Sequence, residues 1–310
     1  MTGCLALDVG GTHVAGAAVN LERHQLVPGT YRYRALDGTA GADDIISDIA
    51  RCAADVRARD NSVSGEDVLA VAMPGPFDYA AGVGQFSDVG KFDHLNGIDV
   101  GTGLRERLTW APARIVFVND AHAFGVGEHL AGPAAGGERT VVVTLGTGVG
   151  SAFLHHGIPV TSGPSVPPLG HVHLLSVAGR PLEDTVSRRA LMNAYARTGR
   201  SQTVDVSEIA ARARAGEVAA HAVFTNAFRA LGGSLAPWLA RFDAQVLVVG
   251  GSIARAFDLL AGPMQEGIGT AKPGLSLPVV QAGSENSAFI GAGWLATHTI
   301  AAAAQQASAS

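Results

Sequence analysis

The sequence predicts an α/β fold with two mixed sheets, and three observations support that prediction. Strand-like apolar runs alternate with segments whose apolar residues recur at helical spacing. Two of the strand-like runs lead through short segments rich in glycine and threonine into a second strand-like run, as hairpins do. The chain has 310 residues, which is long for a single compact core, so we expect two domains.

Each expected element rests on its own pattern. Apolar or β-branched runs bounded by turn residues predict strands, and apolar positions three or four apart, such as Ile45, Ile46 and Ile49, predict amphipathic helices. The expected strands span residues 3–9, 14–20, 31–36, 68–73, 115–118, 141–145, 149–153 and 246–249. The expected helices span residues 42–59, 101–108, 121–130, 181–198, 206–240 with a break near Gly216, and 288–299.

Composition argues against several classes of protein. Hydrophobic residues make up 47% of the chain and charged residues 16%, which supplies ample material for buried sheets. The net charge of −5 provides no basic stripe and argues against a nucleic-acid partner. No apolar run reaches about 18 residues, and the first strand begins too early for a signal peptide. Cys4 and Cys52 show no pairing pattern, which fits a reducing cytoplasm.

The first hairpin combines a carboxylate with two glycines. An apolar strand ends at Asp8, and Gly10, Gly11 and Thr12 follow almost at once. Glycines can take positive φ and carry no Cβ, so their N–H groups can close on a phosphate. Asp8 can reach Mg²⁺ directly or through its water shell. These residues taken alone are explained equally well by a plain hairpin turn.

A second hairpin repeats this design. The strand over residues 141–145 contains Thr144 and runs into Gly146, Thr147 and Gly148 before another apolar strand. A third glycine turn, Gly250-Gly251-Ser252, follows the strand over 246–249 and precedes a helix-like segment. Two such hairpins far apart in one chain predict two lobes that face one polyphosphate.

Asn119 and Asp120 directly follow the strand over residues 115–118. Ligands of open α/β sheets lie beyond the carboxyl ends of the strands, which is where a reactive carboxylate belongs. A helix N-cap is the alternative interpretation, because Asn and Asp both cap well before a helix such as 121–130. A helix cap explains the presence of one of the two polar residues but not of both.

The order of these motifs resembles a known family. Asp-x-Gly-Gly-Thr, Pro-Gly-Pro, Asn-Asp, Gly-Thr-Gly-x-Gly and Gly-Gly-Ser, from about Leu5 to Trp294, resemble the ROK sugar kinases of the actin-like ATPase superfamily. The resemblance implies two ribonuclease H-like domains with an interdomain cleft. The N-terminal domain is expected over 1–118, joined by a C-terminal helix over about 290–304, and the second domain over 119–289.

The resemblance also implies an activity, namely ATP- and Mg²⁺-dependent phosphorylation of the 6-hydroxyl of a hexose, as in a glucokinase. Asp120 is then the catalytic base. Sugar contacts are expected from Gly75, Asp88, Asn119, Asp120, His171 and Glu183. Nucleotide contacts are expected from Asp8, Gly10, Gly11, Thr12, His13, Thr144, Gly146, Thr147, Gly148, Gly250, Gly251 and Ser252. A homodimer is expected by the same resemblance, and the segment 206–240 could supply its surface.

Plainer interpretations stay open for three of these residues. Pro74-Gly75-Pro76 also works as a simple connection. Glu183 also suits the first turn of a helix, where the macrodipole favours an acid. His13 stands where the family usually has lysine, so it either weakens nucleotide binding or simply faces solvent. Lys91, three positions after Asp88, is interpreted as no more than a solvated surface charge.

The family's zinc site is where this chain departs most clearly. Members usually have Glu-x-Gly-His followed by a cysteine cluster, whereas here Pro168 replaces the glutamate and residues 176–182 contain no cysteine. His171 and His173, if on a strand, point the same way but supply only two ligands, so we expect no zinc. His155 and His156 are interpreted as the solvent end of a hairpin.

Two other functions compete with a hexose kinase. An amino-sugar 6-kinase, such as a kanosamine kinase, is plausible because losing the glutamate at Pro168 alters the acceptors offered to sugar hydroxyls. A non-catalytic sugar-binding regulator is the second alternative. Family regulators carry a helix-turn-helix domain before the first glycine loop, whereas this sequence starts at the strand.

Overall fold

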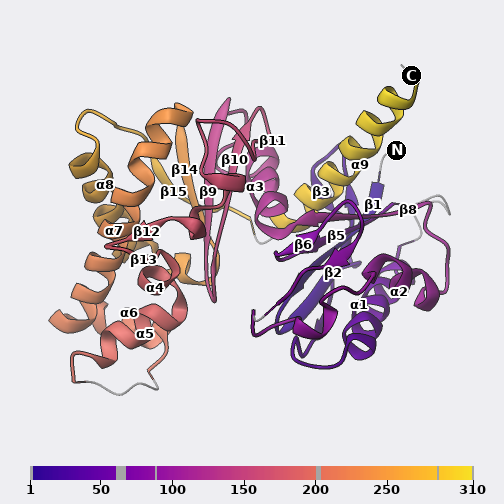
Figure 1. Ribbon diagram of the computed structural model, residues 1–310, viewed down its shortest axis with the longest axis horizontal. Coiled ribbons are helices and arrows are strands. Elements are labelled where there is room, and N and C mark those ends of the chain that lie inside the picture. The colour runs from indigo at the N-terminus through magenta and orange to yellow at the C-terminus, as the bar shows by residue number, and fades with distance from the viewer. Residues whose placement is uncertain (1–2, 61–67, 88, 200–203, 285, 309–310) are drawn as a thin grey trace. The chain divides into compact units, whose positions relative to one another are not determined.

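The computed structural model describes residues 3–60, 68–87, 89–199, 204–284 and 286–308 (Figure 1). The chain divides into two compact units, and both are built from helices and mixed sheets. Unit 1 comprises Met1–Ala131 and Ser284–Ser310, and unit 2 comprises Gly132–Gly283. The predicted α/β class with two mixed sheets is therefore confirmed.

Unit 1 holds the first eight strands and four of the α-helices. Its strands are β1 (Gly3–Gly10), β2 (His13–Asn20), β3 (Gln25–Leu26), β4 (Arg32–Ala35), β5 (Val68–Met73), β6 (Phe77–Asp78), β7 (Val83–Gly84) and β8 (Arg114–Asn119). Its helices are α1 (Ala42–Arg57), α2 (Val100–Arg107), α3 (Asp120–Ala131) and α9 (Ser287–Ser308), with a 3-10 turn, η1 (Asp93–Leu95).

The main sheet of unit 1 joins an antiparallel hairpin to parallel strands. Its order is β3-β2-β1-β5-β8, with β4 also pairing with β2. The hairpin β1–β2 is antiparallel, whereas β1, β5 and β8 run parallel. In this register Asp8 lies opposite Ala72, which in turn lies opposite Val118, so the carboxyl ends of three strands meet at one edge.

Side-chain alternation along β1 sends residues to both faces of this sheet. Leu5 and Leu7 are buried with Ile45 and Ile49 of α1 on one face. Cys4 and Ala6 are buried with residues of α3 and α9 on the other. The C-terminal helix α9 therefore packs within unit 1.

Helices α3 and α9 touch through their backbones. A Cβ on Gly127 would lie 2.0 Å from the Ser287 carbonyl oxygen, and one on Gly291 would lie 1.8 Å from the Ala123 carbonyl oxygen. The buried Glu128 of α3 accepts a 2.6 Å hydrogen bond from the Ser287 hydroxyl at the start of α9. The close crossing fixes α3, and with it the helix end that carries Asp120.

Unit 2 contains the remaining elements. Its strands are β9 (Arg139–Leu145), β10 (Val149–His155), β11 (Ile158–Pro159), β12 (Ser176–Val177), β13 (Arg180–Pro181), β14 (Val246–Gly250) and β15 (Val279–Gln281). Its α-helices are α4 (Glu183–Val186), α5 (Arg188–Ala196), α6 (Val206–Arg214), α7 (Val218–Phe242) and α8 (Phe257–Ala271). Its 3-10 turns are η2 (Pro168–Gly170), η3 (Val172–Leu174) and η4 (Ser252–Ala256).

The main sheet of unit 2 repeats the strand arrangement of unit 1. Its order is β11-β10-β9-β14-β15, in which β11, β10 and β9 are antiparallel and β9, β14 and β15 are parallel. On one face of this sheet, Val141, Val143 and Leu145 of β9 and Leu247 and Val249 of β14 are buried in one cluster with residues of α5, α6, α7 and α8. The same design, a hairpin followed by parallel strands, thus occurs twice in the chain.

Several predicted boundaries differ from the observed ones. The unit boundary falls after α3 instead of at 118/119, because α3 packs on α9 within unit 1. The helix expected over 181–198 is two helices, since Ser187 interrupts it and caps α5 by accepting a hydrogen bond from the Ala190 N–H. The break near Gly216 is confirmed.

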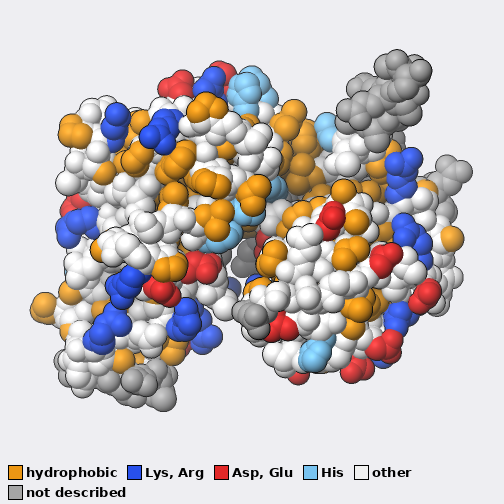
Figure 2. All heavy atoms as spheres, viewed as in Figure 1, with side chains coloured by type: hydrophobic (Ala, Val, Ile, Leu, Met, Phe, Trp, Pro, Cys, Tyr) orange, Lys and Arg blue, Asp and Glu red, His pale blue; other side chains and the backbone are white. Residues whose placement is uncertain are grey.

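No helix in the described part of the chain is both long and apolar enough to span a bilayer. On the face shown in Figure 2, Lys and Arg side chains lie among Asp and Glu side chains on both units.

Candidate functional site

The carboxyl edge of the unit 1 sheet gathers the polar residues that the sequence analysis selected there. Asp8 lies near the end of β1, Asn119 ends β8, and Asp120 is the first residue of α3. Gly75 lies just beyond β5, the strand between β1 and β8. The register therefore brings together residues separated by more than 100 positions in sequence.

Both carboxyl groups at this edge have a raised pKa, mainly because they are buried. Burial raises the pKa of Asp8 to about 6. Burial and the neighbouring Asp8 raise the pKa of Asp120 to about 6, although the Ala121 N–H and Lys91 both act to lower it. The Ala121 N–H bond is 2.8 Å long and belongs to the first turn of α3. An acid that titrates near 6 suits a general base at neutral pH.

Asn119 is the N-cap of α3, a role that the sequence allows for either Asn119 or Asp120. Its Oδ1 accepts a 3.0 Å hydrogen bond from the His122 N–H in the first turn of α3. Its Nδ2 donates a 2.9 Å bond to the Tyr79 hydroxyl, which donates at 3.2 Å to the Met73 carbonyl. Capping therefore accounts for Asn119 and not for Asp120.

The first glycine turn is closely surrounded by side chains. Neither Gly10 nor Gly11 has positive φ, so here glycine provides room for close contacts and not a left-handed backbone. A Cβ on Gly10 would lie 2.7 Å from His13 Cε1, and one on Gly11 would lie 3.2 Å from Lys91 Cδ. Lys91 is partly buried and lowers the pKa of Asp120, so it belongs to this edge and is not a solvated surface charge.

His13 packs flat against Tyr33, with ring centroids 5.7 Å apart and planes 12° from parallel. Its burial lowers the pKa of the imidazole, which therefore carries little charge at neutral pH. Thr12 beside it is exposed at the tip of the turn, and its Oγ1 lies 3.5 Å from His13 Nδ1. His13 cannot supply the fixed charge that lysine has in the family.

The glycine turn of unit 2 is held by its neighbours. The Gly146 N–H donates to the Gly148 carbonyl, and the Gly146 carbonyl accepts from the Arg188 N–H. Glu183 Oε1 accepts a 2.8 Å bond from the Val149 N–H and would lie 2.8 Å from a Cβ on Gly148. Thr147 and Gly148 are the exposed residues of the turn, whereas Thr144 is partly buried on β9. Glu183 thus lies beside this turn, in the first turn of α4.

The third glycine turn lies against the second. Gly251 has φ of 85°, and a Cβ there would lie 2.4 Å from the Leu145 carbonyl oxygen. Only glycine satisfies both conditions without strain. Gly250 ends β14, and Ser252 begins η4 with its Oγ 3.5 Å from the Cβ position of Gly146. Unit 2 therefore brings Gly146–Gly148, Gly250–Ser252 and Glu183 together.

Two further predicted sugar contacts, His171 and Gly75, lie outside helices and strands. His171 and His173 lie at 3-10 turns and not on a strand, with ring centroids 5.0 Å apart. Burial and His173 lower the pKa of His171. Gly75 lies by the Tyr79 hydroxyl, which would be 3.5 Å from a Cβ on it. Asp88 lies outside the described residues.

The carboxylate edge of unit 1 fits a magnesium ion. Asp8 and Asp120 offer oxygen atoms, the donors that Mg²⁺ prefers, and each carboxyl is protonated more readily than an ordinary aspartate. A divalent cation at this edge would relieve their mutual repulsion. Lys91 is the positive charge that already acts on Asp120.

The fold and the site define an α/β protein whose two main sheets have the same strand arrangement. Glycine turns lie at both sheets, and two aspartates lie at the carboxyl edge of the sheet in unit 1. The chain belongs to the ROK family, whose model matches residues 4–299.

Relatives with known descriptions agree with this placement. A glucokinase of Thermotoga maritima is 25% identical over 285 residues, which cover 84% of this chain and 86% of that protein. The structure of a ROK hexokinase from Thermus thermophilus matches with a TM-score of 0.75 at 23% identity, over 96% of this chain and 99% of that one. A ROK family glucokinase from Streptomyces griseus, in complex with glucose and AMPPNP, matches with a TM-score of 0.77 at 20% identity over the same shares.

Proposed function

We propose that this chain is a carbohydrate kinase that transfers the γ-phosphoryl group of ATP to the 6-hydroxyl of a hexose. The observation that carries the proposal is the placement of Asp120 and Asp8 at the carboxyl edge of the parallel strands β1, β5 and β8. Membership of the ROK family and the likeness to glucokinases support it.

Asp120 is the proposed base. Its carboxylate would orient the 6-hydroxyl and accept its proton as the phosphoryl group is transferred. Asn119, Gly75, His171 and Glu183 are the proposed sugar contacts. Because Asn119 is held by Tyr79 and by the first turn of α3, its amide is fixed before any sugar arrives.

The glycine turns are the proposed nucleotide contacts. The Gly146 and Val149 N–H groups already bond within the protein, so the exposed Thr147 and Gly148 are the residues we assign to phosphate oxygens. In unit 1 we assign the same role to Gly10, Gly11 and Thr12. We assign the adenosine end of the nucleotide to Gly250, Gly251 and Ser252. Asp8 would hold Mg²⁺, which neutralises phosphate charge when bound.

A sugar panel tests the proposal and separates it from its alternatives. ADP release is measured with ATP and Mg²⁺ against glucose, mannose, their 2-amino and 3-amino derivatives, and no sugar. The product is then examined by ³¹P and ¹³C nuclear magnetic resonance. We expect sugar-dependent ADP release and a 6-phosphate. A marked preference for an amino sugar would favour the amino-sugar kinase, and sugar binding without ADP release would favour a non-catalytic regulator.

We further propose a homodimer in the cytoplasm. Cys4 and Cys52 are both buried, and neither forms a disulfide, in keeping with a reducing compartment. Light scattering coupled to size-exclusion chromatography tests the dimer, and a mass near 31.6 kDa, that of one chain, would contradict it.

A further inference from the structure

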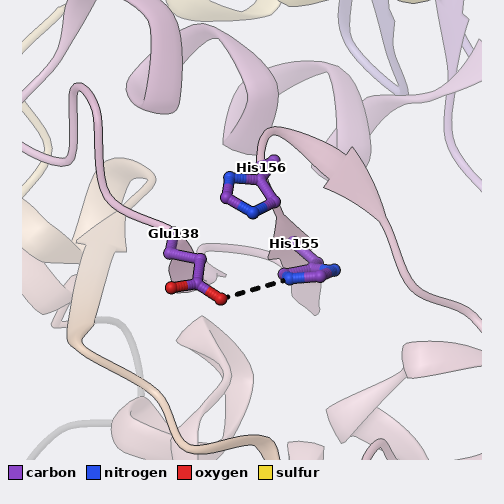
Figure 3. A group of neighbouring side chains, drawn as sticks. All are labelled: Glu138, His155 and His156. Atoms are coloured by element: carbon purple, nitrogen blue, oxygen red, sulfur yellow. Dashed lines mark ion pairs between the residues drawn. The ribbon is translucent and has the colours of Figure 1, made fainter.

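We infer that Glu138, His155 and His156 bind a divalent transition-metal cation. They lie at the end of the β9–β10 hairpin that is farther from its glycine turn. One ligand atom from each of the three residues lies within 4.8 Å of the others. Figure 3 shows the two imidazoles and the carboxylate facing a common space. From the sequence alone, the histidine pair is expected at the solvent end of a hairpin. Glu138 is 17 positions before His155, and only the sheet register brings it near.

The backbone holds the three residues in this arrangement. The strand register pairs His155 with Arg139, and the His156 N–H donates a 2.7 Å bond to the Glu138 carbonyl. The Glu138 N–H donates in turn to Gln245 Oε1 at 2.9 Å. His156 and Gly157 have φ of 49° and 78°, as a tight two-residue hairpin turn requires. The backbone from which the three side chains project is therefore fixed, which lowers the entropy cost of binding a metal.

The spacing and the donor types fit the zinc class of ions. Zinc lies about 2.0–2.2 Å from imidazole nitrogen and carboxylate oxygen, so two tetrahedral ligands are about 3.4 Å apart. His155 Nε2 lies 3.4 Å from Glu138 Oε1. Two imidazoles with one carboxylate suit Zn²⁺ better than Mg²⁺ or Ca²⁺, which prefer oxygen ligands. Water would complete the coordination, since the side chains of His155 and Glu138 are each 46% exposed.

One neighbouring charge acts against a cation. Arg139 Nε lies 3.6 Å from Glu138 Oε1, although the same guanidinium also donates to the Phe242 carbonyl. Competition with Arg139 weakens the site without removing it, because Glu138 has a second oxygen. The cluster lies at the opposite end of β9 from Gly146, about 25 Å away at the usual rise of a strand. Metal binding here is therefore separable from the proposed kinase activity.

Titration calorimetry with Zn²⁺ on the untagged full chain at pH 7.5 tests the site. Glu138→Gln, His155→Ala and His156→Asn each remove one ligand, and asparagine tolerates the left-handed backbone at position 156. We expect saturable Zn²⁺ binding, with the affinity of this site reduced at least about tenfold in each variant. Two variants serve as controls: His94→Ala at an exposed position, and His173→Ala in the other pair of neighbouring histidines. Both should bind Zn²⁺ as tightly as the parent chain does.

The same samples give a second readout. Zn²⁺ should raise the Tm of the parent chain and of the controls, and should raise that of the three variants much less, since a ligand of the native state stabilises it. ADP release by the three variants should match that of the parent. The inference is overturned if the parent shows no saturable Zn²⁺ binding, if the three variants bind Zn²⁺ as tightly as the parent, or if His173→Ala abolishes binding.

Discussion

Asn119 Nδ2 donates a 2.9 Å hydrogen bond to the hydroxyl of Tyr79, a residue 40 positions earlier in the chain. The bond ties the turn between β6 and β7 to the end of β8. It also holds Asn119 beside Asp120, the proposed base. The pKa of Tyr79 is raised, mainly by burial, so the hydroxyl stays protonated and also donates to the Met73 carbonyl.

Tyr79→Phe should weaken sugar binding more than turnover. The substitution removes both hydrogen bonds, which costs about 1–2 kcal/mol of stability and frees the Asn119 amide to move. We expect the KM for the sugar to rise severalfold, with a smaller change in kcat. Steady-state kinetics check this, with Tyr33→Phe, whose side chain is largely exposed, as the matched control. Unchanged KM and Tm would show that the Tyr79 hydroxyl positions nothing.

Asp8→Asn and Asp120→Asn should each stabilise the protein at alkaline pH. Each folded-state pKa lies near 6, above the ordinary value of 3.8, so protonation favours the fold. That contribution is complete below pH 3.8 and is lost as pH rises through 6. At pH 8 without Mg²⁺, each variant should be about 1–2 kcal/mol more stable than the parent.

Chemical denaturation at pH 8 and pH 4 measures the effect of these two substitutions. The gain should shrink toward pH 4, where the parent carboxyls are largely protonated in the fold. An equal or larger gain at pH 4 would be inconsistent with raised pKa values for Asp8 and Asp120.

Lys91→Met should shift the pH dependence of catalysis. The Lys91 ammonium lowers the pKa of Asp120, so its removal allows that pKa to rise. The acidic limb of the kcat/KM profile should therefore move to higher pH, by up to about one unit. Lys272→Met, at an exposed position in unit 2, is the control and should leave the limb in place. A limb that does not move in Lys91→Met would mean that Lys91 does not act on the base.

Gly291→Ala should destabilise unit 1. A Cβ there would lie 1.8 Å from the Ala123 carbonyl, so α9 must move away from α3. We expect a loss of at least about 1–3 kcal/mol in the free energy of unfolding. Gly262→Ala provides the contrast, because nothing lies within 4 Å of its Cβ position in α8 and alanine favours helix. Thermal melts should move in opposite directions for the two variants, and parallel shifts would refute the close crossing.

Local patterns in the sequence predicted much of this fold. The two glycine hairpins, α1, β5 and the break between α6 and α7 were predictable because each depends on neighbouring residues. The very short strands, such as β11 and β15, were missed because two or three residues carry no usable periodicity. Ser187 divides a predicted helix because its side chain caps the next one, which apolar spacing does not reveal.

The site was predicted less completely, because several partners depend on sheet register and loop packing. Strand ends drew attention to Asp8 and Asp120, and the family resemblance gave Asp120 its expected role as the base. Lys91 was interpreted as a possible surface charge, because only packing places its side chain on Gly11. Tyr79 was missed because its partner Asn119 is 40 positions away. No local pattern in the sequence marks either Lys91 or Tyr79 as part of this edge.

The kinetics of Asp120→Asn test the central claim most directly. With the preferred sugar, kcat should fall by about 10²–10⁴, while binding of a non-hydrolysable ATP analogue with Mg²⁺ changes by less than about threefold. Asp44→Asn, at an exposed position on α1, is the control and should retain full turnover. Full turnover by a folded Asp120→Asn protein would contradict the assignment of Asp120 as the base.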